Sequence, residues 1–171
     1  MANDGSMASK VEDWIIAQIQ AIQFNGAAAF EAVEVKPWEG TESGTVGQFA
    51  EELMSATRDH VARVFFSGEE TEELADSQIK LSPTYVVLIG IRNHTPAAAR
   101  RGEVRGAETS WGTNAMRDLL QAAFNQKKPG VTAGSTITDK SHYAGADVVW
   151  HSSNLCIMRA NVIVDEVPKA L

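Results

Sequence analysis

The side chains that could do chemistry in this sequence are scattered rather than grouped. Its four histidines, His60, His94, His142 and His151, are not spaced from one another, from carboxylates or from Cys156 as a metal motif requires. Cys156 lies in an apolar, strand-like run, where a thiol is usually buried and inert. The pattern therefore predicts neither a metal site nor a nucleophilic cysteine.

Two other segments contain residue types that are found in active sites. Residues 40–47 include three glycines but lack the Gly-Lys-Ser/Thr ending of a phosphate-binding loop, and Ser43 lacks the Gly-x-Ser-x-Gly setting of a nucleophilic serine. The acidic residues 69–73 have no glycine turn, so a solvated loop is favoured over a cation site. The sequence therefore predicts no catalytic residue, no cofactor and no metal.

The overall composition is that of an ordinary globular protein. The chain has 171 residues, of which 44% are hydrophobic and 22% are charged, and we expect one domain after a flexible leader at residues 1–8. A net charge of −7 argues against a general nucleic-acid binder. A single cysteine fits a reduced, intracellular origin, and no run approaches the ~20 apolar residues that a membrane span needs.

Residues 84–92 form the longest apolar, β-branched run, and we expect the other elements to be organised around it. Both alternating sets of its side chains are apolar, which predicts a central strand covered on both faces, with Pro83 at its edge. Four acidic side chains precede it and three basic ones follow: Glu69, Glu70, Glu72, Glu73, Arg100, Arg101 and Arg105. A nine-residue strand spans roughly 30 Å. The acidic and basic loops should therefore leave opposite ends of the subunit.

The remaining elements follow from hydrophobic periodicity and turn residues. A capping box of Ser9 and Glu12 predicts a helix that ends near Asn25-Gly26. The other expected elements are a strand at 29–35, a helix from Thr45, a strand at 61–66 ended by Ser67-Gly68, a polar connection at 94–109, a helix ending at Phe124, and a hairpin of 147–151 with 155–165. The order α-β-α-β-β-α-β-β predicts an α+β fold, a mixed, mostly antiparallel sheet with about three helices packed on it.

This order resembles that of the tail-completion or tail-terminator proteins of Mu-like contractile-tailed phages. The similarity rests on the helix that includes Val11-Glu12-Asp13-Trp14-Ile15-Ile16, the strand 85–92, the Arg100-Arg101-Gly102 segment, and the helix 112–124 with its Arg-Asp-Leu-Leu stretch. It covers roughly residues 9–167 through short motifs, and the resemblance implies a single tail-terminator-like domain at 9–171. The acidic segment 69–76 and the leader have no counterpart in that pattern.

The resemblance implies a structural role in the virion tail, after assembly in the host cytoplasm. Terminators cap the tail tube, typically as a hexameric ring, and present the surface that joins the head. The implied partners are further copies of the chain, the tail tube protein, the neck or head-completion protein and, as a further candidate, the sheath protein. DNA would only pass through the lumen, and a negative net charge suits a lumen that does not retain it.

A ring would give the charged segments a use. Guanidinium groups suit paired carboxylates, so we expect the acidic segment of one subunit to meet the arginines of the next in a head-to-tail ring. The expected interface set is Glu69, Glu70, Glu72, Glu73, Arg92, Arg100, Arg101 and Arg105. A merely solvated loop is an equal alternative for the arginine segment. The alternative functions are a neck or baseplate adaptor and, in a different class, a small cytoplasmic enzyme using Asp59, His60 and a distant carboxylate.

Overall fold

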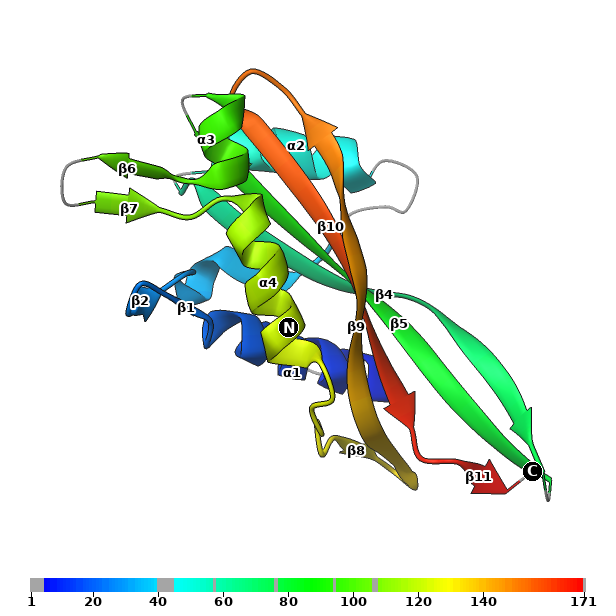
Figure 1. Cartoon of the computed structure of the whole chain (residues 1–171). Helices are drawn as coiled ribbons and strands as arrows, with labels where there is room; N and C mark the ends of the chain where they lie inside the picture. The colour runs from blue at the N-terminus through cyan, green and yellow to red at the C-terminus, as the bar shows by residue number, and fades with distance from the viewer. Residues whose placement is uncertain are drawn as a thin grey trace.

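The computed structural model describes residues 5–39, 45–56, 58–75, 77–93, 95–105 and 108–170. Its centre is a seven-stranded sheet with helices on both faces (Figure 1). The sheet runs in the order β3 (Val35–Pro37), β4 (His60–Leu74), β5 (Gln78–Arg92), β10 (Leu155–Glu166), β9 (Thr136–His151) and β8 (Thr132–Ala133), and β11 (Lys169–Ala170) pairs with β5. Among the described strands of this sheet only β3 and β4 pair in parallel, so the predicted α+β class with a mostly antiparallel sheet is confirmed.

The described residues form four α-helices rather than about three. They are α1 (Met7–Gln20), α2 (Thr45–Ser55), α3 (Pro96–Arg101) and α4 (Thr113–Phe124), and a 3₁₀ turn, η1, covers Ala32–Glu34. Two small hairpins stand apart from the main sheet: β1 (Gln23–Phe24) with β2 (Ala27–Ala28), and β6 (Glu103–Arg105) with β7 (Glu108–Ser110). Without α3, the two separate hairpins, β8 and β11, the order is α1-β3-α2-β4-β5-α4-β9-β10. It matches the predicted order, although β3 is a three-residue strand that overlaps the predicted strand 29–35 only at Val35.

The central strand is covered on both faces, as predicted. Helices α1 and α4 pack on the face that carries Tyr85, Val87, Ile89 and Ile91, and α2 packs on the face of Val86 and Leu88. The α2 contact is close at Gly90, where a Cβ atom would lie 2.5 Å from Leu53 Cδ2. Strand β10 repeats the pattern, because every second residue from Cys156 to Val164 is buried on the α1/α4 side.

Strands β4 and β5 continue beyond the helices as a projecting two-stranded arm, which we define as residues 68–74 and 78–83 (Figure 1). The prediction that β4 ends at Ser67-Gly68 and leads into an acidic loop was wrong. Gly68, with a φ of 151°, lies at a register shift after which the pairing continues to Leu74, so the glycine accommodates a β-bulge instead of a turn.

The start of β5 was also misplaced, because Pro83 lies inside the strand rather than at its edge. Proline has no N–H to donate, and the last β10 pairing along β5 is Ile163 with Thr84. Strand β10 therefore separates from β5 where the ladder would need that donor. The arm keeps β4 as its neighbour on one side and meets β11 only near its tip, at Gln78 and Ile79.

Helix α1 begins and ends earlier than its sequence pattern suggested. Ser6, not Ser9, is the N-cap and accepts a hydrogen bond from the Ser9 N–H at 3.1 Å, so the helix starts inside the expected leader. Glu12 instead accepts a hydrogen bond from the Phe66 N–H of β4 at 2.7 Å. Asn25 and Gly26 have φ values of 51° and 81° and form the β1–β2 turn, because positive φ at both positions suits a tight hairpin.

Two further segments differ from the predictions, and others lie outside the described residues. In the range 29–35, predicted to be a strand, residues 32–34 form η1 and only Val35 belongs to a strand, β3. The connection 94–109 contains α3 and the β6–β7 hairpin, because Thr95 caps a helix whose first position, Pro96, tolerates a missing N–H. The predicted helix to Phe124 and the C-terminal hairpin are confirmed, although β9 begins earlier, at Thr136. Ser43, Thr57, Asp76, His94 and Gly106 lie outside the described part of the chain.

Candidate assembly surface

The acidic side chains gather on the arm, along β4. Glu69, Glu70, Glu72 and Glu73 are all exposed. Because directly opposed residues share a sheet face, Glu70 and Glu72 share the face of Ser82 and Lys80, whereas Glu69 and Glu73 point to the other face. None of the four forms an ion pair with another described residue. Both faces of the arm are therefore acidic.

The outer side of β4 is an open sheet edge in the arm. Strand β3 pairs only with residues 62–64 of β4, and beyond it the Phe66 N–H is taken by Glu12. From Gly68 to Leu74, β4 has no neighbour except β5 among the described strands. Such an edge presents unpaired backbone groups to a further strand, and charged side chains are one way in which proteins protect it.

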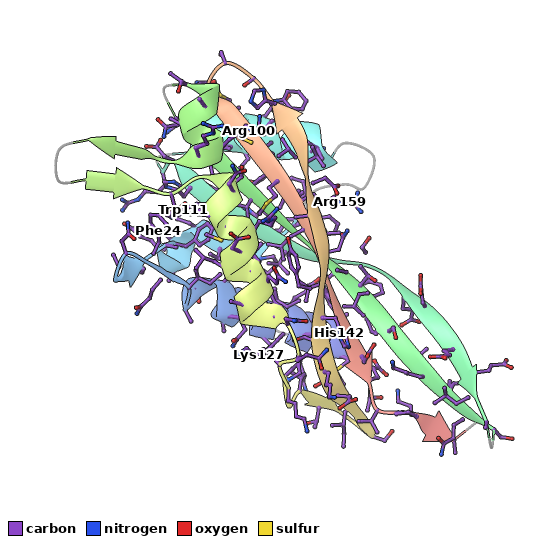
Figure 2. The ribbon with its side chains drawn as sticks, viewed as in Figure 1. Phe24, Arg100, Trp111, Lys127, His142 and Arg159 are labelled. Carbon is purple, nitrogen blue, oxygen red and sulfur yellow. The ribbon has the colours of Figure 1, made fainter. Side chains whose placement is uncertain are left out.

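The basic residues lie at the other end of the molecule, as the strand length predicted. Arg100 and Arg101 are exposed in the last turn of α3, and Gly102, with a φ of 82°, ends the helix and leads into β6, which contains Arg105. Figure 1 shows α3 and the β6–β7 hairpin at the end of the sheet remote from the arm, and Figure 2 labels Arg100 there. The arginines belong to a helix end and a short hairpin, not to the loop that was predicted.

Arg92 differs from the other residues of the predicted interface set, because its guanidinium is engaged inside the subunit. It donates hydrogen bonds to the carbonyl oxygens of Met54 and Ala56, each at 3.0 Å, and pairs with the Asp59 carboxylate at 3.1 Å. These carbonyls lie at the C-terminal end of α2, where helix carbonyls have no partner within the helix. Arg92 thus caps α2 and ties it to the end of β5.

The sequence reasoning missed Arg63, a buried arginine in the apolar part of β4. Its guanidinium donates to the carbonyl oxygens of Glu34 (2.9 Å) and Ala62 (2.7 Å) and pairs with the Glu52 carboxylate of α2. It therefore joins η1, β4 and α2. The available signal was a single arginine within the otherwise apolar run 61–66, because a buried charge needs a specific partner.

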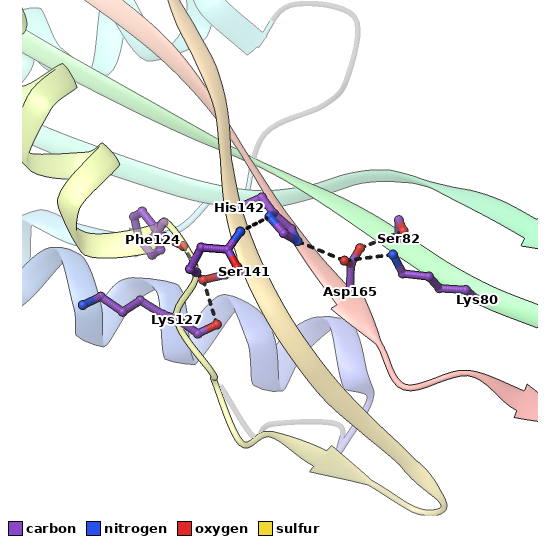
Figure 3. Close-up of polar contacts among 8 residues, drawn as sticks. Lys80, Ser82, Phe124, Lys127, Ser141, His142 and Asp165 are labelled. Carbon is purple, nitrogen blue, oxygen red and sulfur yellow. Dashed lines mark hydrogen bonds and ion pairs between the residues drawn. The ribbon is translucent and has the colours of Figure 1, made fainter.

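A polar network crosses three strands where the sheet narrows toward the arm (Figure 3). Asp165 accepts hydrogen bonds from Ser82 (2.8 Å), Lys80 (3.0 Å) and His142 (3.0 Å), and Gln126 contacts the other ring nitrogen of His142 at 3.1 Å. Burial raises the pKa of Asp165, but the three hydrogen bonds together outweigh it and lower that pKa. In a catalytic triad a nucleophile would bind the histidine, whereas here the serine binds the carboxylate. The arrangement holds β5, β9 and β10 together.

The residues of the enzyme alternative line a polar cavity of about 330 Å³ together with Glu31, Glu34 and Arg58. His60 Nε2 donates a hydrogen bond to the Trp111 carbonyl at 3.2 Å, and the two rings pack with centroids 4.2 Å apart. Burial lowers the pKa of His60, which favours its neutral form. Asp59 is held by Arg92, and both Glu31 and Glu34 are within ion-pair distance of Arg58, at 2.6 and 3.6 Å.

An apolar groove of about 720 Å³ lies between α2 and the β9–β10 turn, at the end remote from the arm. Met54 and Trp150 line it and are 52% and 42% exposed. Cys156 is fully buried, as predicted, and burial raises the pKa of its thiol. Among the described residues there is no group of three His, Cys, Asp or Glu that could hold a metal ion, and no helix long and apolar enough to cross a membrane.

At one end the molecule thus has an acidic arm with an open β4 edge. At the other end it has the arginines of α3 and the β6–β7 hairpin, which is separate from the main sheet. Comparison of the sequence with protein-family models and with curated protein sequences finds no match.

Proposed function

We propose that this protein is a structural component of a phage tail, a terminator that caps the tail tube as a ring and forms the surface that joins the head. The observation that carries the proposal is the separation of charge along the central strand pair. Exposed glutamates occupy the arm, and exposed arginines occupy the opposite end. The order of the main elements, α-β-α-β-β-α-β-β, is also the order on which the resemblance to tail terminators rests.

The placement of the charges predicts that neighbouring copies join an acidic arm to a basic end. Contacts that bring arm to arm or basic end to basic end would be repulsive, whereas both an antiparallel two-fold pair and a head-to-tail contact would join opposite charges. In a head-to-tail contact every arm meets a basic end. Such contacts form a ring when the rotation between subunits closes. The proposal takes the subunit number as six.

The partners in this proposal are further copies of the chain, the tail tube protein and a neck or head-completion protein, and the sheath protein is a further candidate. Viral DNA passes through the lumen without being retained, because the chain carries a net charge of −7 and phosphate binding depends on basic contacts. The protein would then be part of the virion tail and would be assembled in the host cytoplasm. A neck or baseplate adaptor built on the same subunit is the second candidate.

The enzyme alternative receives less support from the geometry. A general base needs a free lone pair directed at substrate, and a nucleophile needs that base within hydrogen-bond distance. Asp59 pairs with Arg92, and His60 packs against Trp111 and forms no hydrogen bond with a serine, threonine or cysteine in the described part of the chain. These contacts suit a packing role for His60 and an ion-pairing role for Asp59.

Mass and imaging test the proposal directly. Light scattering coupled to size-exclusion chromatography should give about 111 kDa, six times the 18.5 kDa chain, at low salt or after addition of tail tubes. Electron micrographs of tubes assembled with the protein should show uniform lengths and a ring at one tube end. A protein that stays monomeric under both conditions and leaves tube length unchanged would contradict the proposal.

A charge reversal tests the basic end. Arg101→Glu should weaken the ring and increase its sensitivity to salt, because it places a carboxylate opposite the acidic arm. Lys128→Glu is the matched control, since Lys128 is an exposed base that follows α4 and lies outside the predicted interface. Equal assembly of both variants with the parent at every ionic strength would show that Arg101 is only solvated.

A further inference from the structure

Among the described strands with an open edge, two lie at opposite ends of the molecule. One is the arm portion of β4, whose outer edge has no neighbour among the described strands. The other is β6, which pairs only with β7 in a ribbon separate from the main sheet. Both ribbons project from the body in Figure 1.

We propose that β6 of one copy adds to the arm edge of β4 in the next copy, so that a four-stranded β5-β4-β6-β7 sheet crosses each subunit contact. The inference rests on the head-to-tail assembly proposed above, but it specifies backbone pairing rather than contact between charges alone. Strand addition satisfies the open N–H and C=O groups of both edges.

The β4 edge of the arm is open to an added strand along its length, whereas the β5 edge is partly covered by β11. Near the tip, Gln78 and Ile79 of β5 already pair with Ala170 and Lys169 of β11. The β4 edge has no corresponding cover from Gly68 to Leu74 among the described residues. A strand that joins the arm therefore has its longest free edge along β4.

The charge on the two edges selects the occupant. Glutamates project from both faces of the arm, so an added strand meets acidic neighbours whichever way its side chains alternate. Two acidic arms would repel each other, which disfavours pairing of β4 with its own copy. Residues 100–105 carry three arginines and one glutamate, Glu103, so the chain that leads into β6 is basic although the three residues of β6 have no net charge.

The proposed pairing is short, so a single contact would be weak and the contacts would become stable only together, in a closed ring. Strand β6 has three residues, so it covers only part of the seven-residue β4 edge in the arm. Each contact thus adds few backbone hydrogen bonds. Ring closure makes the last contact intramolecular and so stabilises all of them together.

Disulfide trapping tests this pairing, because Cys156 is buried and gives little background. Four full-length variants each carry Val104→Cys in β6 and one second cysteine in the arm, at Glu69→Cys, Glu70→Cys, Thr71→Cys or Glu72→Cys. Strand pairing brings same-face Cβ atoms of neighbouring strands close together and keeps the alternate positions apart. One same-face pair, either 69 and 71 or 70 and 72, should therefore cross-link at least about tenfold faster than the other pair. The control variant carries Val104→Cys with Glu51→Cys, an exposed position of α2, and should not cross-link.

Light scattering on each variant separates the two proposals. A ring with alternating cross-links supports strand addition. A ring whose four positions cross-link equally or not at all overturns strand addition and leaves the terminator proposal intact. A chain that remains monomeric, alone and with tail tubes, overturns both, and the glutamates would then serve only to protect an open edge.

Discussion

Strands β4 and β5 pass through two different environments, and the contrast separates what stabilises the subunit from what it presents to others. In the body, residues 61–64 and 85–91 are buried between α2 on one face and α1 with α4 on the other. In the arm, the same two strands expose four glutamates and keep one open edge. One continuous pair of strands thus serves as core at one end and as surface at the other.

The comparison teaches that strand length and burial are independent here. The hydrophobic effect scales with the apolar area removed from water, so the arm adds little of it. The pairing of β4 with β5 continues along the arm past the bulge at Gly68. The Asp165 network holds the strands together at the base of the arm. An element that adds little to stability and carries concentrated charge is better suited to contacts between subunits than to folding.

The largest expected effect compares one substitution at two places on β5. Ile89→Ala removes a fully buried side chain and should lower the free energy of unfolding by about 2–5 kcal/mol. Ile79 lies on the same face of the same strand but in the arm, where its side chain is half-buried. Ile79→Ala should therefore cost about 1 kcal/mol or less. Urea denaturation measures both. Equal losses would mean that the arm belongs to the core.

The next comparison sets Arg92 against Arg101. Arg92→Ala leaves carbonyl groups at the C-terminal end of α2 without their donor and should cost about 1–3 kcal/mol of unfolding free energy. Arg101→Ala, at an exposed helix end, should stay within about 0.5 kcal/mol of the parent. Thermal and chemical denaturation at high salt, which removes assembly effects, would check both values. A neutral Arg92→Ala would contradict the capping role.

A smaller effect concerns pH and the body alone. Burial lowers the pKa of His60 below its ordinary 6.5 in the folded state, so the unfolded chain takes up a proton first as pH falls. The stability that neutral His60 contributes is present above pH 6.5 and is lost as pH falls below it. His60→Gln keeps a donor for the Trp111 carbonyl without titrating. We expect urea midpoints between pH 7.5 and 5.5 to fall less in this variant; identical slopes would contradict the assignment.

The smallest effect is expected in the arm. The pair Glu70→Gln and Glu72→Gln removes two like charges from one sheet face and should change the free energy of unfolding of the monomer by no more than about 0.5 kcal/mol. The change should be small because relief of the Glu70–Glu72 repulsion is offset by loss of the attraction between Glu72 and Lys80, which lies opposite it. A loss above about 1 kcal/mol, measured by chemical denaturation, would show that these glutamates support the fold itself.

The apolar alternation was the part of the fold that sequence reasoning could predict. Because Val86 and Leu88 point to one face and Val87 and Ile89 to the other, the sequence predicted that both faces are covered, and the structure has helices on both. The same period predicted the buried face of β10 that begins at Cys156. In both strands a local repeat determined a tertiary environment, because side chains alternate strictly between faces.

Glycine, proline and the arginines were harder to interpret, because their roles depend on partners distant in sequence. Gly68 is a turn signal by type, yet pairing with β5 makes it a bulge. Pro96 stops a strand but also starts a helix when Thr95 caps it. Arg92 and Arg101 look alike in the sequence, and only the position of α2 gives Arg92 an internal partner. The open β4 edge was missed for the same reason, since a segment with four glutamates is typical of a loop.

An exchange of charge between the two ends tests the central claim most directly. One variant carries Arg100→Glu with Arg101→Glu, a second carries lysine in place of all four arm glutamates (Glu69, Glu70, Glu72 and Glu73), and light scattering gives the mass of each alone and of their equal mixture at low salt. Each variant alone should be monomeric, because like charges meet at every contact. The mixture should recover a ring of alternating variants, since each altered end then meets its opposite. A mixture that remains monomeric while the parent forms a ring would contradict head-to-tail contact between the acidic arm and the arginines.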